Sequence, residues 1–288
     1  MNFPRILKKR KGYIDRIKPF MQKSVAKVLT GQRRVGKSFL LYQLIEEILG
    51  EEPDANIIYI NLEDFAFSSL QTAEDLHSYI ISHSKEKAKN YIFIDEIQDI
   101  PGFEKVIRSL LLNEDNDIYI TGSNAKMLSG ELATYLSGRY IEFKIYSLSY
   151  SEFLEFHGLT ESETSYELYS RYGGLPYLLN LPLEDETVNE YLKSVYSTIV
   201  FRDVVSRYKL RNTLFLEKLI QFLSEHIGNL FSAKNISDYL KSQHTAISVN
   251  QIQSYTEYLN NAFLIHRVER YDLIGKRVFE IGEKYYFE

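Results

Sequence analysis

Residues 31–38 match the phosphate-binding pattern G-x-x-x-x-G-K-[ST] at every fixed position, with the sequence Gly31-Gln32-Arg33-Arg34-Val35-Gly36-Lys37-Ser38. The glycines allow the backbone to curl so that its N–H groups face a phosphate, Lys37 can reach the β- and γ-phosphates, and the Ser38 hydroxyl can ligate Mg²⁺. Residues 24–30 are typical of a short strand, and residues 39–45 open a helix. Because this order points a helix N-terminus at the anion, it predicts a nucleotide site in an α/β fold rather than an ordinary glycine-containing turn.

The composition limits the class of protein. A length of 288 residues suggests about two domains, and no apolar run approaches the roughly 18 residues that span a bilayer. The basic start of the chain lacks the apolar segment of a signal peptide. The lack of cysteine excludes disulfides, thiolate catalysis and cysteine-ligated metals, and the six histidines show no His-x-x-x-His spacing. We therefore expect a cytoplasmic protein that does not contact a membrane.

The charge is unevenly distributed along the chain. The formal net charge of −5 argues against wholesale coating of nucleic acid. Residues 5–37 nevertheless hold twelve lysines and arginines and one acid, Asp15. Part of this charge belongs beside nucleotide phosphates, but Lys8 to Lys11 come too early in the chain for the loop itself. They are either a solvated end of the chain or a nucleic-acid patch.

Two further apolar runs are suited to buried strands. Residues 57–62 form one, and residues 91–96 form another that ends in Asp95 and Glu96. Acids at the carboxyl end of a buried parallel strand lie where open sheets bind ligands. Asp95 is placed to hold Mg²⁺, directly or through water, and Glu96 is placed to take a proton from the attacking water.

A fourth strand is expected over residues 117–124 and a fifth over residues 139–145. The polar end of the fourth strand could sense the γ-phosphate through Ser123 and Asn124, with Thr121 behind them; the alternative is a polar turn. Arg139 enters the fifth strand, and an arginine near a γ-phosphate stabilises charge during phosphoryl transfer. It could equally be a surface residue.

The strands alternate with helices, which we expect over residues 38–49, 72–87 and 103–113. This alternation favours an α/β fold with a parallel sheet and right-handed crossovers. The phosphate contacts of such a site are expected from the loop and from the sensor residues, namely Gly31, Gln32, Arg33, Arg34, Val35, Gly36, Lys37, Ser38, Phe39, Ser123 and Asn124.

Five motifs occur in order along the chain: residues 31–38, Ile94-Asp95-Glu96-Ile97-Gln98, Thr121-Gly122-Ser123-Asn124, Leu136-Ser137-Gly138-Arg139 and Tyr172-Gly173-Gly174-Leu175-Pro176. Together they resemble the motifs of the predicted AAA-superfamily ATPases of bacteria and archaea that carry a C-terminal domain of unknown function. The resemblance implies a three-layer P-loop fold with strand order 5-1-4-3-2, followed by a helical region and a winged helix. It also implies ATP rather than GTP, in agreement with the lack of an Asn-Lys-x-Asp motif.

The same resemblance implies that Gly173, Gly174 and Pro176 pack near the nucleotide, although a helix end followed by a proline-started helix is the alternative. Members of this group often continue into a nuclease-like domain. The present sequence stops at residues 284–288, in an expected strand, so it is either truncated or a short member.

The second half of the chain is expected to be mostly helical. Residues 150–172 carry aromatic residues at a spacing of three to four, which is typical of core packing, and residues 190–208 are expected to form a helix. Helices over 214–227, from 232 and over 249–265 precede an alternating segment, 267–287, with a β-wing around residues 272–276. We expect domains at 1–148 (ATPase core), 149–210 (helical lid or linker) and 211–288 (winged helix).

The sequence thus favours an ATP-hydrolysing, Mg²⁺-dependent molecular switch or motor subunit, in which Glu96, Lys37 and Arg139 are catalytic and Ser38 and Asp95 hold the metal. Arg139 is expected to act in its own chain or in a neighbouring subunit. The alternatives are a kinase, a nucleotide-regulated DNA-binding protein and a scaffold with a vestigial loop. Because the helix over 249–265 has no lysine or arginine, we expect the winged helix to contact a protein client rather than DNA. The expected partners are ATP, a protein client or DNA at the winged helix, and further copies of the chain.

Overall fold

The structure is a computed structural model that describes residues 8–125, 136, 138–243, 247–269 and 283–288. The chain divides into two compact units, residues 1–189 and 190–288. The three-domain division expected from the sequence stays a prediction. Among the described residues, no helix combines the length and the apolar character that are needed to cross a membrane.

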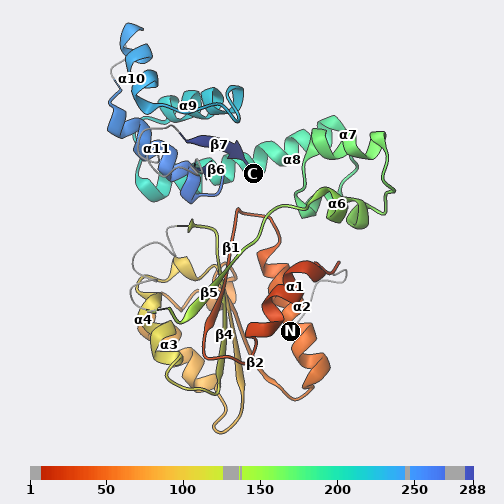
Figure 1. The fold of residues 1–288 in the computed structure, drawn as a ribbon. Helices are drawn as coiled ribbons and strands as arrows, with labels where there is room; N and C mark the ends of the chain where they lie inside the picture. Colours follow the sequence, from red (N-terminus) through yellow and green to blue (C-terminus); the bar gives the residue numbers. More distant parts are fainter. Residues whose placement is uncertain (1–7, 126–135, 137, 244–246, 270–282) are drawn as a thin grey trace, which may run out of the picture. The chain divides into compact units, whose positions relative to one another are not determined.

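The first unit is built on a five-stranded parallel sheet (Figure 1). Its strands are β1 (Ala26–Thr30), β2 (Asn56–Asn61), β3 (Asn90–Asp95), β4 (Asn116–Gly122) and β5 (Tyr140–Lys144). They lie in the order β2-β3-β4-β1-β5, which is the predicted order 5-1-4-3-2 read from the other edge, and so that prediction is confirmed. The three inner strands, β1, β3 and β4, are buried at every position, as near-continuous apolar runs require.

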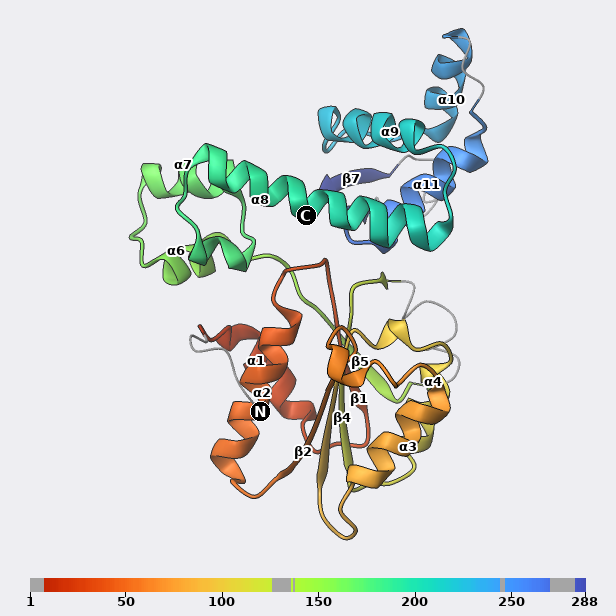
Figure 2. The ribbon, with the colours of Figure 1, turned by 180° about the vertical axis from the view of Figure 1, so that it is seen from behind.

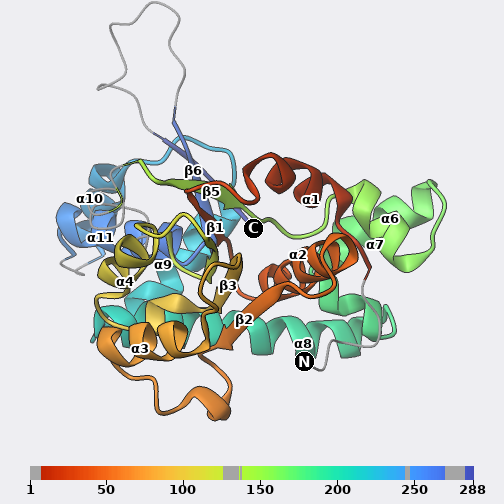
Figure 3. The same ribbon diagram turned by 90° about the horizontal axis from the view of Figure 1, so that it is seen from below.

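Helices cover both faces of this sheet (Figures 1 and 3). On one face, α1 (Lys11–Ile17) and α2 (Lys37–Glu51) pack against the rings of Tyr91, Phe93 and Tyr119. On the other face, α3 (Ala73–His83) and α4 (Phe103–Leu110) pack against β-branched side chains of β1 to β4. Because alternate residues of a strand point to opposite faces, each strand contributes to both cores. The short helices η1 (Lys18–Phe20), η2 (Phe65–Phe67) and η3 (Ile97–Asp99) connect these elements.

Several helix ends differ from the prediction; the helix expected over 103–113, for example, ends at Leu110. The helix expected over 72–87 ends at His83, because Ser84 has an extended backbone with ψ 142°. The helix expected to reach Ile265 ends at Asn261, because Phe263 adopts a left-handed conformation and Ile265 begins a strand. Local turns of this kind override helix propensity, and they are hard to predict from composition.

The remainder of the first unit is helical. It contains α6 (Tyr150–His157), α7 (Glu163–Tyr172) and η6 (Pro176–Asn180), and α8 (Asp185–Thr198) begins in it. Capping boxes start α6 at Ser149 and α7 at Ser162. Of the predicted aromatic core, Phe153 is fully buried, whereas Tyr166 is exposed. The prediction that these aromatic residues pack in the core therefore holds for Phe153 but not for Tyr166.

In the second unit, the end of α8 continues as the π-helical segment η7 (Ile199–Ser206). Then follow α9 (Thr213–Glu225), α10 (Ala233–Ser242), α11 (Val249–Asn261) and the antiparallel strands β6 (Ile265–Val268) and β7 (Lys284–Phe287). Figure 2 shows β7 beside α9. Leu230, between α9 and α10, forms an isolated antiparallel bridge with Lys284. The expected wing at 272–276 lies outside the described residues.

Candidate nucleotide site

The parallel register brings the predicted site residues to one edge of the sheet. Thr30 at the end of β1 pairs with Gly122 at the end of β4, and β3 lies on the other side of β4. The phosphate loop follows β1, Glu96 follows β3 and Ser123 follows β4. The three segments that follow these strands therefore meet at the carboxyl edge, where open parallel sheets bind ligands.

The phosphate loop is held in a conformation that suits anion binding. Gly31 has φ +152°, and a Cβ atom there would lie 2.1 Å from the carbonyl oxygen of Ile145, so glycine alone fits. Arg34 and Gly36 have φ angles of 69° and 94°, and Gly36 directly precedes the 15-residue helix α2. Left-handed residues before a helix favour a concavity of backbone N–H groups with the positive end of the helix dipole behind it.

Lys37 lies inside the curve of this loop. Its ammonium group donates hydrogen bonds of 2.9 Å to the carbonyl oxygens of Gly31 and Gln32, and it lies 3.9 Å from Oε1 of Glu96. The side chain is only 4% exposed. A buried cation is therefore fixed between the loop and the end of β3.

Asp95 is a buried carboxylate surrounded by hydroxyl groups. It accepts hydrogen bonds from Thr121 and Ser38, and the hydroxyl of Tyr59 lies 3.4 Å from its Oδ2. Burial raises the pKa of Asp95, although the bonds from Ser38 and Thr121 oppose this shift. A carboxylate beside a serine hydroxyl is the kind of hard oxygen donor set that suits Mg²⁺.

Glu96 is fixed by three contacts although its backbone is strained. Its φ of 56° is left-handed, a conformation that costs about 1–3 kcal/mol for a residue other than glycine. Its N–H donates to the Thr121 hydroxyl at 3.0 Å, and its Oε2 accepts from Ser123 at 3.0 Å and Gln98 at 2.6 Å. These contacts aim the carboxylate toward Lys37.

The charges around Glu96 keep it ionised. Burial raises its pKa, but the nearby cations Lys37 and Arg33 and the two hydrogen bonds to Oε2 lower it, and the net shift is downward. Glu96 is therefore a carboxylate at neutral pH, whereas Asp95, one residue away, has its pKa raised. Environments that shift the pKa values of adjacent carboxyl groups in opposite directions are typical of functional sites.

The segment that resembles a Gly-Gly-x-Pro element lies beside the loop. The Pro176 ring lies 3.7 Å from the position that a Cβ atom of Gly36 would occupy. Gly174 accepts a 2.7 Å hydrogen bond from the N–H of Leu148, and a Cβ atom on Gly174 would lie 2.2 Å from the Leu148 carbonyl oxygen. Close backbone contact therefore requires glycine at position 174.

Comparison with known proteins agrees with this geometry. Residues 23–154 match a family described as an AAA domain, and residues 163–288 match one described as a domain of unknown function. An uncharacterized protein of Haemophilus influenzae is 37% identical over 287 residues, which cover 96% of this chain and 70% of that protein. The chain belongs to the AAA-domain family. A second uncharacterized relative, from Methanocaldococcus jannaschii, is 32% identical over 265 residues. The match covers 88% of this chain and 58% of that relative.

Solved structures are also similar to the chain, at low sequence identity. The Orc1 protein of Aeropyrum pernix in complex with DNA is 13% identical, with a TM-score of 0.44 and coverage of 99% of this chain and 90% of that one. The replication initiator DnaA bound to AMPPCP and single-stranded DNA is 17% identical, with a TM-score of 0.38 and coverage of 78% and 73%.

The structure does not bring Arg139 of the AAA protein to this site. The Arg139 carbonyl accepts from the N–H of Ala26, at the amino end of β1, and β5 runs parallel to β1. With about 3.3 Å per strand residue, Arg139 lies at the opposite edge of the sheet from Gly31. Its side chain is exposed. This register disagrees with the expectation that Arg139 stabilises the phosphates bound by its own chain. That Arg139 acts on the nucleotide of a neighbouring subunit stays a prediction.

Other predicted loop residues point in different directions. Val35 is buried in the core beneath α2, Arg33 forms a 3.0 Å ion pair with Glu63, and Arg34 is exposed. Phe39 is 46% exposed. Asn124 is buried beside Ser123 at the end of β4.

The sequence reasoning missed several residues at this edge. Tyr59 of β2 approaches Asp95 and contacts the hydroxyl of Tyr42 at 3.1 Å, and burial raises the pKa of Tyr59. Gln98 holds Glu96; its position within the recurring Ile94–Gln98 motif was the available signal. Tyr59 gave no signal, because it falls within an ordinary apolar strand.

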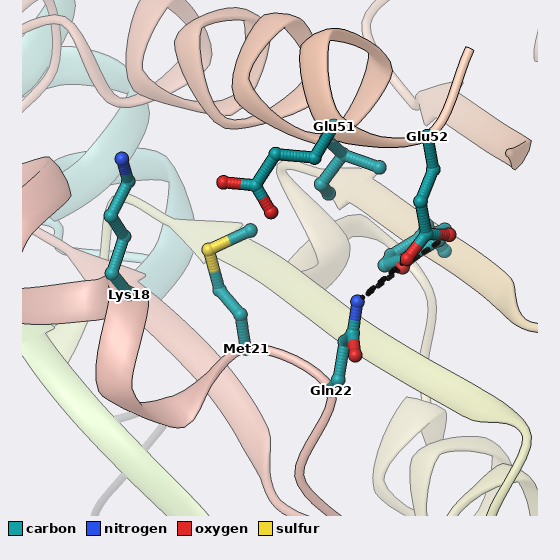
Figure 4. A pocket seen from close by; sticks show the side chains of 7 residues that line it. Lys18, Met21, Gln22, Glu51 and Glu52 are labelled. Carbon is teal, nitrogen blue, oxygen red and sulfur yellow. Dashed lines mark hydrogen bonds between the residues drawn. The ribbon is translucent and has the colours of Figure 1, made fainter.

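A pocket of about 260 Å³ lies away from these groups, at the amino edge of the sheet (Figure 4). Its lining comes from the ends of η1 and α2 and the start of β3, and consists of Lys18, Met21, Gln22, Ile48, Glu51, Glu52 and Tyr91. None of the predicted nucleotide residues lines this pocket.

Proposed function

We propose that this AAA protein binds ATP with Mg²⁺ and hydrolyses it, as a molecular switch or motor subunit. The observation that carries the proposal is the connected set of buried groups at the carboxyl edge, in which Thr121 contacts both Asp95 and Glu96, and Lys37 lies 3.9 Å from Glu96. An isolated phosphate-binding loop would not require two acids with opposite pKa shifts beside it.

The donor set fits the proposed ligands. The loop N–H groups and Lys37 would hold the phosphates, and Ser38 and Asp95 would hold Mg²⁺. Among the described residues, no cluster of three or more His, Asp or Glu side chains could bind a metal on its own. This agrees with Mg²⁺, which proteins usually bind through one or two carboxylates together with substrate phosphates. The bound ion would neutralise charge that develops on the phosphates.

The positions of the protein groups support a proposed role for each of them in hydrolysis. A water oxygen forms a bond to the γ-phosphorus, the bond from that phosphorus to the β–γ bridging oxygen breaks, and the water proton passes to Glu96. Lys37 stabilises the negative charge on the transferred group. Ser123, which donates to Glu96, and Asn124 would sense the presence of the γ-phosphate. Hydrolysis would then change how the C-terminal unit docks.

The decisive experiment compares Mg²⁺-dependent phosphate release from ATP in the wild type and in Glu96→Gln. We expect turnover to fall by a factor of at least about 100, while binding of a fluorescent ATP analogue persists, because the amide keeps the shape but cannot accept the proton. The matched control is Glu86→Gln, an exposed acid, which should leave turnover unchanged. Equal release by wild type and Glu96→Gln would contradict the proposal.

Nucleotide identity rests on the family resemblance. We expect ATP to displace the fluorescent analogue at lower concentration than GTP in the same binding assay. Preferential displacement by GTP would overturn the assignment of ATP while leaving the phosphate site in place.

We propose that residues 211–288 form a winged helix. Three helices, an isolated β-bridge at Leu230 between the first two, and the β6–β7 pair support this assignment. Its described surface favours a protein client over DNA, because Arg267 is paired with Glu269 at 2.7 Å and with Glu283 at 3.4 Å. A cation that is already paired contributes less to phosphate neutralisation.

A further inference from the structure

The basic run near the N-terminus makes specific contacts with three parts of the first unit. Lys8 donates to the carbonyl oxygens of Glu155 and Phe156 at the C-terminal end of α6. Lys9 forms a 2.9 Å ion pair with Glu47 of α2. The sequence suggested that these residues form either a solvated end of the chain or a nucleic-acid patch. Neither alternative accounts for the contacts of Lys8 and Lys9 with the rest of the unit.

Arg10 is the most buried member of this run, with 3% of its surface exposed. Its Nη1 donates to the carbonyl oxygen of Val35 in the phosphate loop at 3.2 Å and to that of Tyr146 at 2.8 Å. Its Nε and Nη2 donate to the two carboxylate oxygens of Glu152 in α6 at 2.8 and 2.9 Å. A fixed guanidinium fork is well suited to joining several acceptors at once.

The backbone on the N-terminal side of Arg10 is also held. The Arg10 N–H donates to Oε1 of Gln43 at 2.9 Å, and Nε2 of Gln43 donates to the carbonyl oxygen of Lys8 at 3.0 Å. Gln43 lies on α2, the helix that begins at the phosphate loop. The backbone that carries the guanidinium is therefore anchored to the helix that begins at the phosphate loop.

Glu152 has a second role at the start of α6. Its Oε2 accepts from the N–H of Ser149 at 2.9 Å, which closes the capping box of that helix. Burial raises the pKa of Glu152, and the hydrogen bonds from Arg10 and Ser149 lower it further than burial raises it. One carboxylate thus joins Arg10 to the first turn of α6.

We propose that Arg10 is a positioning residue that couples the phosphate loop to helix α6. A displacement of the Val35 carbonyl moves the guanidinium, and the guanidinium moves Glu152 and the first turn of α6. Nucleotide binding at the loop would in this way be transmitted to residues 146–149 and to helix α6. The nucleotide part of the inference rests on the function proposed above, whereas the mechanical link rests on the contacts of Arg10 alone.

The first test is a double-mutant cycle on the affinity for a fluorescent ATP analogue. Arg10→Met and Glu152→Gln should each weaken binding by about tenfold, within the ~5–150-fold range of typical coupling between sites. Glutamine preserves the capping box. The double variant should bind like either single variant, because both remove the same link. Additive losses, or no loss in Glu152→Gln, would overturn the coupling.

The second test does not require nucleotide. Amide hydrogen exchange of the free protein should become faster in Arg10→Met both at Leu40, next to the loop, and at Leu148 and Phe153, near the start of α6. Lys9→Met is the matched control. It removes the exposed ion pair that the neighbouring residue makes with Glu47, and it should leave these amides protected. Faster exchange on one side alone would refute the link. If the wild type binds no nucleotide, the proposed function fails, and exchange alone decides whether Arg10 couples the two segments.

Discussion

At the scale of single residues, Thr121 connects the two acids of the site. Its hydroxyl donates to Asp95 and accepts from the N–H of Glu96, and it is fully buried. A hydroxyl has one proton to donate and lone pairs to accept with, so a single small side chain sets the position of both carboxylates.

Thr121→Val tests this role, because valine keeps the shape and removes both hydrogen bonds. Two buried polar groups lose a partner, so we expect the free energy of unfolding in urea to fall by about 1–3 kcal/mol. ATP turnover should fall by about 10–100-fold, as is usual when groups that hold a metal ligand are removed.

Thr256→Val is the control for that experiment. Thr256 is also buried and donates to the carbonyl oxygen of Ile252 in α11, so the same substitution should affect stability without a specific loss of turnover. Unchanged turnover in Thr121→Val would show that Glu96 is positioned without it.

The sequence was informative about residues whose role is local. The loop at 31–38 and the acids at the end of β3 are recognisable because their function requires a fixed spacing and a strand–loop–helix order. The links made by Thr121 and Arg10 depend on contacts across 25 and 142 residues of sequence. No local pattern encodes such contacts, and the position of Arg139 likewise became clear only from the strand register.

At the scale of elements, β1 and β4 are joined by a buried ion pair below the site. Lys27 and Asp117 are both fully buried and form an ion pair. Asp117 also accepts from the N–H of Gln22 at 2.8 Å and from the hydroxyl of Tyr119 at 2.7 Å. Burial lowers the pKa of Lys27, and Asp117 opposes that shift. Such a pair specifies which strands are neighbours more than it adds stability.

Removing one partner should therefore be far more harmful than removing both. We expect Lys27→Met to lower the free energy of unfolding by about 3–5 kcal/mol, because Asp117 is left as an uncompensated buried charge. The double variant Lys27→Met, Asp117→Asn should recover part of this loss. Arg171→Met, which breaks the exposed pair with Asp185, should cost at most about 1 kcal/mol. Urea unfolding followed by circular dichroism measures all three; equal losses in the first two would disprove the argument.

Strand order shows where prediction at this scale succeeded. Alternation of strands and helices indicated a parallel sheet from the residues, but the order 5-1-4-3-2 came from the family resemblance. Pairing between β1 and β4, which lie about 90 positions apart, is not visible in hydrophobic periodicity. Helix ends such as those of α3 and α11 depend on one left-handed or extended residue, and so they were predicted less well.

At the scale of the whole molecule, charge argues against tight DNA binding. The net charge is −5, and Arg267 is paired with acids. We expect gel-shift titration to show weak retention of duplex DNA at about 150 mM salt, with a dissociation constant above ~10⁻⁶ M, as for non-specific contacts.

The comparison for this titration is the double variant Glu269→Gln, Glu283→Gln, which releases Arg267 and should bind DNA more tightly than the wild type. Tight, strongly salt-dependent binding by the wild type, without ATP turnover, would instead favour the nucleotide-regulated DNA-binding protein.

The segment after β5 has almost no freedom in its length. Ile145 donates to Thr30 and its carbonyl lies against Gly31, the carbonyls of Tyr146 and Ser147 accept from Arg10, and Leu148 pairs with Gly174. Four consecutive residues thus each have an assigned partner. Adding or deleting one residue in this stretch would move every later residue away from its partner, so we expect changes in chain length to be tolerated elsewhere in the chain rather than here.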